Sequence, residues 1–303
     1  MKQFLLYCVF MIMMVPESPA QDSTVSGLHI MMDEVVIKAA KNGWDLAGFI
    51  RRMKEDTTFY KAFLGLRVVA YTSDNEIRIL DEDNKTLARL ENRTVQTMKG
   101  DCRTVQVTNE QVSGDYYDRK KQARYYTAEL FGNLFFRPRV NECGATDIIG
   151  RQARAKGKIE KNKEQLKQLV FNPGSKVEGI PFVGKKASVF DEDIAQRYDF
   201  QLKFAQHNGE ECYLFRAIPK PQYKDDVVYN QLDTWFRISD YAIVARDYAL
   251  SYHTLLYDFD VVMKVRLEKV GQRLLPSTID YRGNWHIFSK KRERSHFSIL
   301  FDY

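Results

Sequence analysis

Residues 257–268, YDFDVVMKVRLE, carry the clearest structural pattern of this chain. Apolar side chains occupy every second position, namely Tyr257, Phe259, Val261, Met263, Val265 and Leu267. The residues between them are charged, apart from Val262. Because successive side chains of a β-strand point to opposite faces of the sheet, this period of two predicts a strand with one apolar and one polar face. Such strands are typical of antiparallel sheets that pack one face on a core.

The same alternation recurs on both sides of this stretch. Asn208-Gly209, Ser239-Asp240 and Val270-Gly271 are short turns of the kind that join hairpin strands. The strand-like segments around them are residues 198–205, 212–218, 227–236, 241–252, 274–281 and 297–301. Since strands joined by short turns pair with their neighbours in sequence, residues 173–303 are predicted to form one meandering antiparallel sheet.

Residues 21–150 are predicted to contribute helices and short strands to the same fold. Apolar residues recur at helical spacing in residues 27–41 and 44–53, and an aromatic stretch follows at residues 59–63. Shorter β-like segments and one helix-like stripe come next, at residues 66–72, 76–80, 86–96, 103–107 and 124–136. Amphipathic helices and a wide half-apolar sheet each need a partner surface. The predicted fold class is therefore α+β, mainly β: a large curved antiparallel sheet, an open half-barrel, with the N-terminal helices packed on its apolar face.

A strongly basic segment separates the two parts. Between Arg151 and Lys167 the chain has seven Lys or Arg residues and two Glu residues. Since such charge runs are usually solvated, residues 151–172 are predicted to be a basic helical connector within one continuous fold. The alternative is that the basic residues contact anionic lipid headgroups of a membrane. The net charge of the whole chain is only +6, so nucleic acid is not a predicted partner.

The first twenty residues have the order of a secretory signal peptide. Lys2 precedes an apolar run from Phe4 to Val15, and Ser18-Pro19-Ala20 offers small residues for cleavage, so the mature chain is expected to start near Gln21. This run is shorter than the roughly 20 residues that span a bilayer as a helix, although an uncleaved anchor is the alternative. No transmembrane helix is predicted after signal removal. The protein is therefore expected to be exported.

Removal of the signal peptide leaves three cysteines, Cys102, Cys143 and Cys212. Their spacing has no CxxC pair and no Cys/His pattern of a zinc site, so no metal is predicted. In an oxidising compartment one disulfide and one buried thiol are expected. Because Cys102 and Cys143 flank loop-like sequence, whereas Cys212 lies in a strand pattern, we favour a Cys102–Cys143 disulfide and leave the other pairings open.

The sequence offers no catalytic motif. The histidines, His29, His207, His253, His286 and His296, fall in no metal-ligand spacing, and no phosphate-binding glycine loop or GxSxG elbow occurs. Asp258 and Asp260 alternate on one strand face, about 6.5–7 Å apart, where paired carboxylates could act on glycosides. The plainer interpretation pairs them with basic neighbours such as Arg246 or Lys264. No catalytic residue and no cofactor is predicted, and a non-catalytic role is favoured.

Six short motifs stand out along the mature chain. They are Asp56-Thr57-Thr58-Phe59-Tyr60-Lys61-Ala62-Phe63, Thr234-Trp235-Phe236, Arg246-Asp247-Tyr248, Asp258-Phe259-Asp260, Pro276-Ser277-Thr278-Ile279 and Gly283-Asn284-Trp285. This set resembles a group of exported Bacteroidetes envelope proteins of unassigned function. The succession of long hairpins is also similar, more loosely, to the lipoprotein-carrier (LolA/LolB-like) fold, although residues 72–150 have no counterpart there. In that fold an open half-barrel wraps helices and holds acyl chains. The resemblance implies a periplasmic location, soluble or peripherally attached to the envelope.

The apolar face of so wide a sheet needs a shield, and a bound apolar ligand is one candidate beside the helices. The predicted function is that of a binding or carrier protein for a lipidic or other apolar ligand. Residues predicted to line its cavity are Phe200, Phe204, Phe215, Trp235, Phe259, Met263 and Tyr281. Residues predicted to form a helical lid are Trp44, Phe49, Ile50 and Met53. In the alternative, all these side chains are ordinary core.

Two other classes of function are left open. A scaffold or assembly factor would bind other envelope proteins through an open sheet edge. An outer-membrane β-barrel is suggested by Phe297, Ile299, Phe301 and Tyr303, which alternate up to the last residue. The early helices and the basic segment fit that second class poorly.

Overall fold

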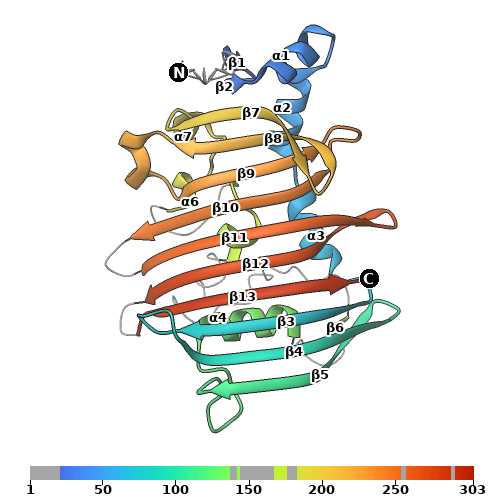
Figure 1. The fold of residues 1–303 in the computed structure, drawn as a ribbon, viewed down its shortest axis with the longest axis vertical. Helices are drawn as coiled ribbons and strands as arrows, with labels where there is room; N and C mark the ends of the chain where they lie inside the picture. The colour runs from blue at the N-terminus through green and yellow to red at the C-terminus, as the bar shows by residue number, and fades with distance from the viewer. Residues whose placement is uncertain (1–20, 137–141, 144–166, 176–182, 254–256, 288–290) are drawn as a thin grey trace, which may run out of the picture.

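Figure 1 shows the fold of a computed structural model, which describes residues 21–136, 142–143, 167–175, 183–253, 257–287 and 291–303. Thirteen strands of these residues form one sheet. In chain order they are β1 (Gln21–Val25), β2 (Leu28–Met32), β3 (Tyr71–Leu80), β4 (Thr86–Lys99), β5 (Cys102–Gly114), β6 (Glu142–Cys143), β7 (Tyr198–His207), β8 (Glu210–Pro219), β9 (Tyr229–Arg237), β10 (Ile243–His253), β11 (Tyr257–Val270), β12 (Arg273–Ile287) and β13 (Glu293–Asp302). Their order in space is β1-β2-β7-β8-β9-β10-β11-β12-β13-β3-β4-β5-β6.

Two meanders build this sheet. Strands β7 to β13 pair in chain order and antiparallel, and Asn208 and Gly209 turn β7 into β8 with φ angles of 50° and 82°. Strands β3 to β5 come earlier in the chain and join the first meander where β3 pairs with β13. The β1–β2 hairpin is added in parallel to β7, which leaves β1 and β6 at the two edges. This open, mainly antiparallel sheet confirms the predicted fold class.

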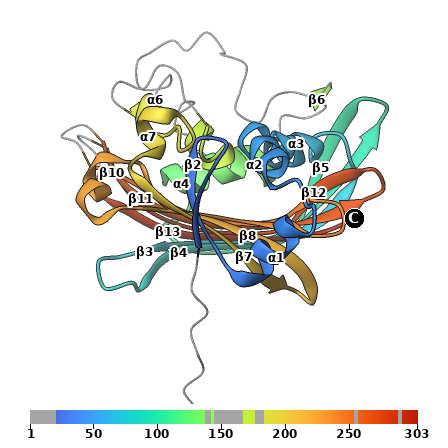
Figure 2. The same cartoon turned by 90° about the horizontal axis from the view of Figure 1, so that it is seen from above.

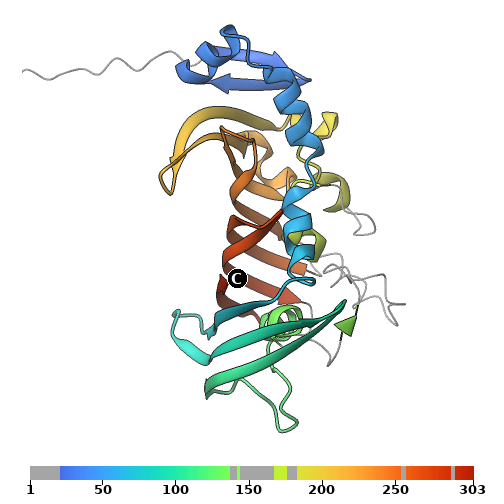
Figure 3. The same ribbon diagram turned by 90° about the vertical axis from the view of Figure 1, so that its right-hand side faces the viewer.

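Most helices lie on one face of the sheet, which we call the inner face (Figures 2 and 3). The helical elements are α1 (Glu34–Lys41), α2 (Leu46–Glu55), α3 (Thr58–Gly65), α4 (Tyr126–Phe131), the π-helix η1 (Gly132–Phe136), α6 (Val183–Lys186), α7 (Glu192–Ala195) and the 3-10 helix η2 (Pro221–Asp226). Residues 167–171 are also helical. Helices α2, α3, α4, α6 and α7 lie on the inner face, whereas α1 lies beside β7 on the other side (Figures 2 and 3). Helices α2 and α3 run across the strands on the inner face, as the sequence predicts (Figure 3). A second cover lies beside them, formed by α4, η1, residues 167–171, α6 and α7 (Figure 2). The sequence predicts a helix-like stripe at residues 124–136 and a helical end of the connector, but not α6 and α7.

Alternate side chains of the strands supply the core. Phe259, Val261 and Met263 of β11 are at most 1% exposed, whereas Val262 between them is 41% exposed on the opposite, outer face. The period of two that the sequence shows at residues 257–268 thus separates the inner face from the outer face. The same pattern holds in β3 and β13.

Specific contacts hold the N-terminal helices to the sheet. Asp33 caps α1, because its Oδ1 accepts a 2.9 Å hydrogen bond from the Val36 N–H. The other oxygen, Oδ2, accepts a 2.6 Å bond from the Phe204 N–H of β7. Helix α3 approaches β12 closely at Gly65, where a Cβ atom would lie 2.5 Å from a methyl carbon of Leu275.

Two segments differ from their predicted secondary structure. Residues 28–32, expected to begin a helix, form β2, because they pair with β1 and β7. Residues 73–75, which separate the predicted β-like segments 66–72 and 76–80 and have a turn-like composition, are instead part of β3, because Ser73 and Asn75 point to the inner face and bond to β4. Ser73 Oγ lies 2.6 Å from Thr94 Oγ1, and Asn75 Nδ2 donates to Asn92 Oδ1 at 2.9 Å. Cross-strand pairing therefore overrides the turn-like composition.

The structure describes little of the predicted signal peptide and basic connector. The predicted signal peptide, residues 1–20, and residues 151–166 of the predicted connector lie outside the described residues. At the end of the connector, Leu169, Val170 and Phe171 are at most 1% exposed. In the parts of the chain that the structure describes, no helix is both long enough and apolar enough to span a membrane.

The predicted disulfide is confirmed. Cys102 and Cys143 are bonded and join β5 to β6, in which the two residues are direct cross-strand partners. Cys212 of β8 is a buried free thiol, as expected for the unpaired third cysteine.

Candidate functional site

Five of the seven predicted cavity residues lie together on the inner face. Phe200, Phe215, Phe259, Met263 and Tyr281 are at most 2% exposed. Phe190 packs on Phe200 and Phe215 with ring centroids 6.3 and 6.0 Å away, Trp285 lies 4.8 Å from Phe259, and Phe131 lies 4.8 Å from Tyr281. The inner face is thus a continuous aromatic surface whose side chains contact one another and the helical cover.

The other two predicted cavity residues are placed differently. Phe204 is half-buried and lies beyond Leu202, the last residue of β7 that pairs with β2. The prediction that Trp235 lines the cavity is wrong, because this residue lies on the outer face. There the Arg266 guanidinium is 5.7 Å from its ring centroid and the His207 ring is 5.5 Å away. Its neighbours in β9 are the residues that face inward. Strand alternation therefore excludes Trp235 from the inner surface.

The predicted lid residues lie on the same surface. Phe49, Ile50 and Met53 of α2 are at most 5% exposed. The Phe49 ring contacts Phe236 of β9 at 5.1 Å between centroids, and half-buried Trp44 stacks on Tyr213 of β8 at 4.4 Å. Helix α2 thus covers the inner face over β8 and β9.

Three of the motifs that stand out in the sequence meet at one buried arginine. Arg246 of β10 is 7% exposed and points to the inner face. Its Nε donates a 3.0 Å hydrogen bond to Thr234 Oγ1 of β9. Its guanidinium carbon lies 4.5 Å from the centroid of the Phe59 ring of α3, a cation–π contact. Asp56, at the end of α2, acts on the arginine electrostatically.

The charge of Arg246 is poorly compensated. No carboxylate of the described residues forms an ion pair with it, and Asp56 contributes only at longer range. Burial lowers the pKa of Arg246 to about 10, against the opposing effect of Asp56, so the side chain stays protonated at neutral pH. A buried charge without a paired counter-charge is rare in folded proteins, because its desolvation is costly. This arginine was not among the predicted site residues. It lies in phase with inward-facing Tyr248 and Leu250, and that spacing could have identified it.

Buried tyrosines fasten the second cover beside this arginine. Tyr229 Oη donates a 2.7 Å hydrogen bond to the Leu169 carbonyl, and Tyr248 Oη donates to the Val170 carbonyl. Tyr248 Oη also lies 3.0 Å from the Met263 sulfur. Burial raises the pKa of both tyrosines, so the hydroxyls remain donors at neutral pH. Helical residues 167–171 therefore rest on β9 and β10 through two hydroxyl groups that satisfy carbonyls at their C-terminal end.

The outer face carries hollows lined by charged side chains. One of about 610 Å³ lies over β11, β12, β13 and β3, and includes Arg78, Arg282 and His296. His296 links two strands, since its Nε2 lies 2.7 Å from Asp280 of β12 and its Nδ1 lies 2.5 Å from Arg78 of β3. The hydrogen bond from His296 lowers the pKa of Asp280. These contacts form a cross-strand ion network on the outer face.

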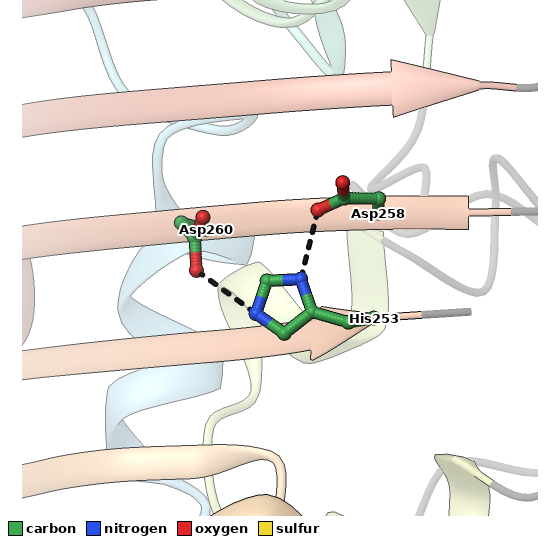
Figure 4. Close-up of side chains that lie close together, drawn as sticks. All are labelled: His253, Asp258 and Asp260. Carbon is green, nitrogen blue, oxygen red and sulfur yellow. Dashed lines mark hydrogen bonds and ion pairs between the residues drawn. The ribbon is translucent and has the colours of Figure 1, made fainter. Parts of the chain in front are cut away.

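Asp258 and Asp260 also lie on the outer face, beside His253 (Figure 4). His253 Nδ1 is 2.8 Å from Asp258 Oδ1, and its Nε2 is 3.5 Å from Asp260 Oδ1. The three side chains offer ligand atoms within 4.8 Å of one another, as a divalent cation would require. Arg292, however, forms an ion pair with Asp258. Burial raises the pKa of Asp258, but the hydrogen bonds from Arg292 and His253 outweigh it and lower the pKa.

This cluster corrects the predicted pairing of the two aspartates. Arg246, named as a partner from sequence, points to the opposite face of the sheet. Arg292 already forms an ion pair with Asp258, and one imidazole contacts both carboxylates. The arrangement is thus a cross-strand polar cluster at the ends of β10 and β11.

No protein-family model matches this chain, and no curated protein matches its sequence. Among solved structures, this chain is similar to a domain from Vibrio parahaemolyticus assigned to outer membrane lipoprotein sorting. The match covers 82% of this chain and 91% of that domain, at 8% identity and a TM-score of 0.26. A DUF1329 family protein from Desulfovibrio piger covers 86% and 90%, at 13% identity and a TM-score of 0.24. A LolA superfamily protein from Nitrosomonas europaea covers 81% and 91%, at 11% identity and a TM-score of 0.22.

Proposed function

We propose that this protein is a non-catalytic binding or carrier protein for a lipidic or other apolar ligand, and that it works in the periplasm after export. The ligand would lie between the inner face of the sheet and the helical cover. The observation that carries the proposal is that separate, short helices cover the aromatic inner face. The longest of them beside the Arg246 site, α2, has ten residues. Since such helices depend on tertiary contacts for stability, one of them can leave the sheet without unfolding it.

Residues 167–171 are the part of the cover that we propose moves to admit the ligand. Their described contacts with the sheet include two hydroxyl-to-carbonyl hydrogen bonds and the apolar contacts of Leu169, Val170 and Phe171. The Phe171 ring meets Phe63 of α3 at 5.1 Å between centroids. Lifting this segment would uncover the inner face beside Met263 and Tyr248, within the predicted cavity.

Analysis of co-purified lipid tests the proposal directly. Protein purified from the periplasm without detergent is extracted with organic solvent, and the extract is analysed by mass spectrometry. We expect a lipid in stoichiometric amount. A lipid-free protein that also fails to bind the apolar fluorophore N-phenylnaphthylamine would count against the carrier function.

Removal of the two tyrosine hydroxyls tests the moving segment. The double variant Tyr229→Phe, Tyr248→Phe loses both bonds to residues 167–171, each worth about 1 kcal/mol. We expect N-phenylnaphthylamine to exchange several-fold faster. Tyr198→Phe is the matched control, because the Tyr198 hydroxyl is buried and donates to the Tyr229 carbonyl within the sheet at 2.9 Å. Equal exchange rates in the control and the double variant would contradict this role of the segment.

A second function, that of an envelope scaffold, is favoured by β5. Among the described residues, β5 is paired on its far side by the two-residue strand β6, at Cys102 and Arg103. Residues 104–114 contain no proline or lysine, two devices that block edge pairing. Co-purification of one envelope protein in stoichiometric amount, without lipid, would favour this function over the carrier.

A further inference from the structure

We propose that the ligand carries an anionic head group on an apolar chain, and that Arg246 binds this head group. The inference rests on the proposed carrier function and assigns the chemical class of its ligand. The shared chemistry is a carboxylate or a phosphate, as in a fatty acid or a phospholipid.

The hydrogen-bonding capacity of Arg246 is mostly unused. A guanidinium has five N–H donors. Among the described residues, the acceptor for Arg246 is the Thr234 hydroxyl, which takes the Nε–H. The Phe59 ring covers the guanidinium plane but accepts no conventional hydrogen bond. The two terminal nitrogens therefore remain available for a planar, two-oxygen partner.

The nearest acidic group is already engaged elsewhere. Asp56 Oδ1 accepts a 2.9 Å bond from the Thr58 N–H, and both carboxylate oxygens contact Thr58 Oγ1, at 2.8 and 2.9 Å. These bonds hold Asp56 at the start of α3. The other groups with an electrostatic effect on Arg246 are the hydroxyls of Tyr248 and Tyr229, which stay neutral at neutral pH. An incoming anion would thus meet a cation with no competing ion pair.

The apolar chain of the ligand has a path beside this head-group site. Tyr248 lies two residues from Arg246 on the same face of β10, and its hydroxyl contacts Met263 of the predicted cavity. Tyr248 also holds residues 167–171, the part of the cover proposed to move, through its hydrogen bond to the Val170 carbonyl. The head group and the first part of the chain would therefore lie side by side.

Two ligands with the same apolar chain, one charged and one neutral, measure how much the charge of the head group contributes to binding. Hexadecanoate and hexadecanol are each titrated into the delipidated full chain in competition with N-phenylnaphthylamine. We expect hexadecanoate to bind about 10- to 100-fold more tightly, the range that hydrogen bonds to a charged group supply. Arg246→Met should abolish this difference by lowering the affinity for hexadecanoate. Arg282→Met is the control, because this arginine is exposed on the outer face, and it should keep the preference.

The outcomes distinguish this inference from the proposed function. If neither ligand binds, the carrier function fails and the inference fails with it. If both bind equally to the natural chain, the carrier function stands and the anionic head group is refuted. If Arg246→Met keeps the preference, the carrier function stands and the assignment of Arg246 as the residue that binds the head group is refuted. Arg246→Lys, which keeps the charge, provides a second measurement should the Met variant fold poorly, and it should retain part of the preference. Hexadecyl phosphate then distinguishes a phosphate head group from a carboxylate. Tighter binding than hexadecanoate would identify a phosphate, and weaker binding a carboxylate.

Discussion

Truncation of Phe49 should release α2 from the sheet. The Phe49 side chain is 2% exposed, and its ring lies 5.1 to 5.9 Å from those of Phe236, Trp44, Tyr241 and Tyr213. Replacing a buried Phe with Ala costs about 3–5 kcal/mol through lost transfer energy and the cavity left behind. Each aromatic contact adds about 0.5–1.5 kcal/mol beyond area, although these values are not additive. We therefore expect Phe49→Ala to lower the free energy of unfolding by about 4 kcal/mol.

Urea unfolding followed by circular dichroism measures this change. The matched control is Val35→Ala in α1, where the side chain is 48% exposed and the expected change is within about 0.5 kcal/mol. Since the Phe49 variant also uncovers Tyr213 and Phe236, its folded form should bind more N-phenylnaphthylamine than the control. A loss below about 1 kcal/mol for Phe49→Ala would mean that α2 is not held on the inner face, and the description of the helical cover would be wrong.

Three further predictions concern stability. Cys102→Ser opens a disulfide with a sequence separation of 41 residues and should cost about 4 kcal/mol from loop entropy, measured by urea unfolding under oxidising conditions. Burial raises the pKa of Tyr71 to about 12. Because the folded state then holds the hydroxyl proton more tightly than the unfolded state, Tyr71 contributes about 3 kcal/mol to stability below pH ~10. This contribution is lost as the pH rises through 12. Alkaline titration of Tyr71→Phe should lack this loss, and an unchanged pH profile would contradict it. Asp33→Ala removes the bonds to Val36 and Phe204 and should cost about 1–3 kcal/mol, whereas Asp22→Ala on the edge strand β1 should be nearly neutral in the same unfolding assay.

Local pattern was enough to predict the elements that depend on nearest neighbours along the chain. The alternation at residues 257–268 predicts which side chains of β11 are buried, because a strand places successive residues on opposite faces whatever its partners are. Asn208-Gly209 predicts a hairpin, because these residues tolerate the positive φ angles of a tight turn. The helical spacing of Phe49, Ile50 and Met53 predicts α2 and its buried face.

Pairing between distant segments is not encoded in such local patterns. Residues 28–32 became a strand because β7, some 170 positions later, offers a free edge to pair with. The direction in which Trp235 points depends on its position within β9, and its apolar character gave no sign that the ring would lie under Arg266 on the outer face. In both cases long-range pairing overrides local preference, because a strand is stabilised by its partners.

The sequence thus predicted most of the strands and the apolar face of the sheet, which follow from short-range periodicity. It favoured the Cys102–Cys143 disulfide but left the other pairings open. Only folding brought Phe59 of α3 to Thr234 and Arg246, which are cross-strand partners in the β9–β10 hairpin much later in the chain. Their meeting depends on where α3 crosses the sheet, and no local pattern contains that information. The physical reason is that burial of a charge is a property of the whole packed surface around it.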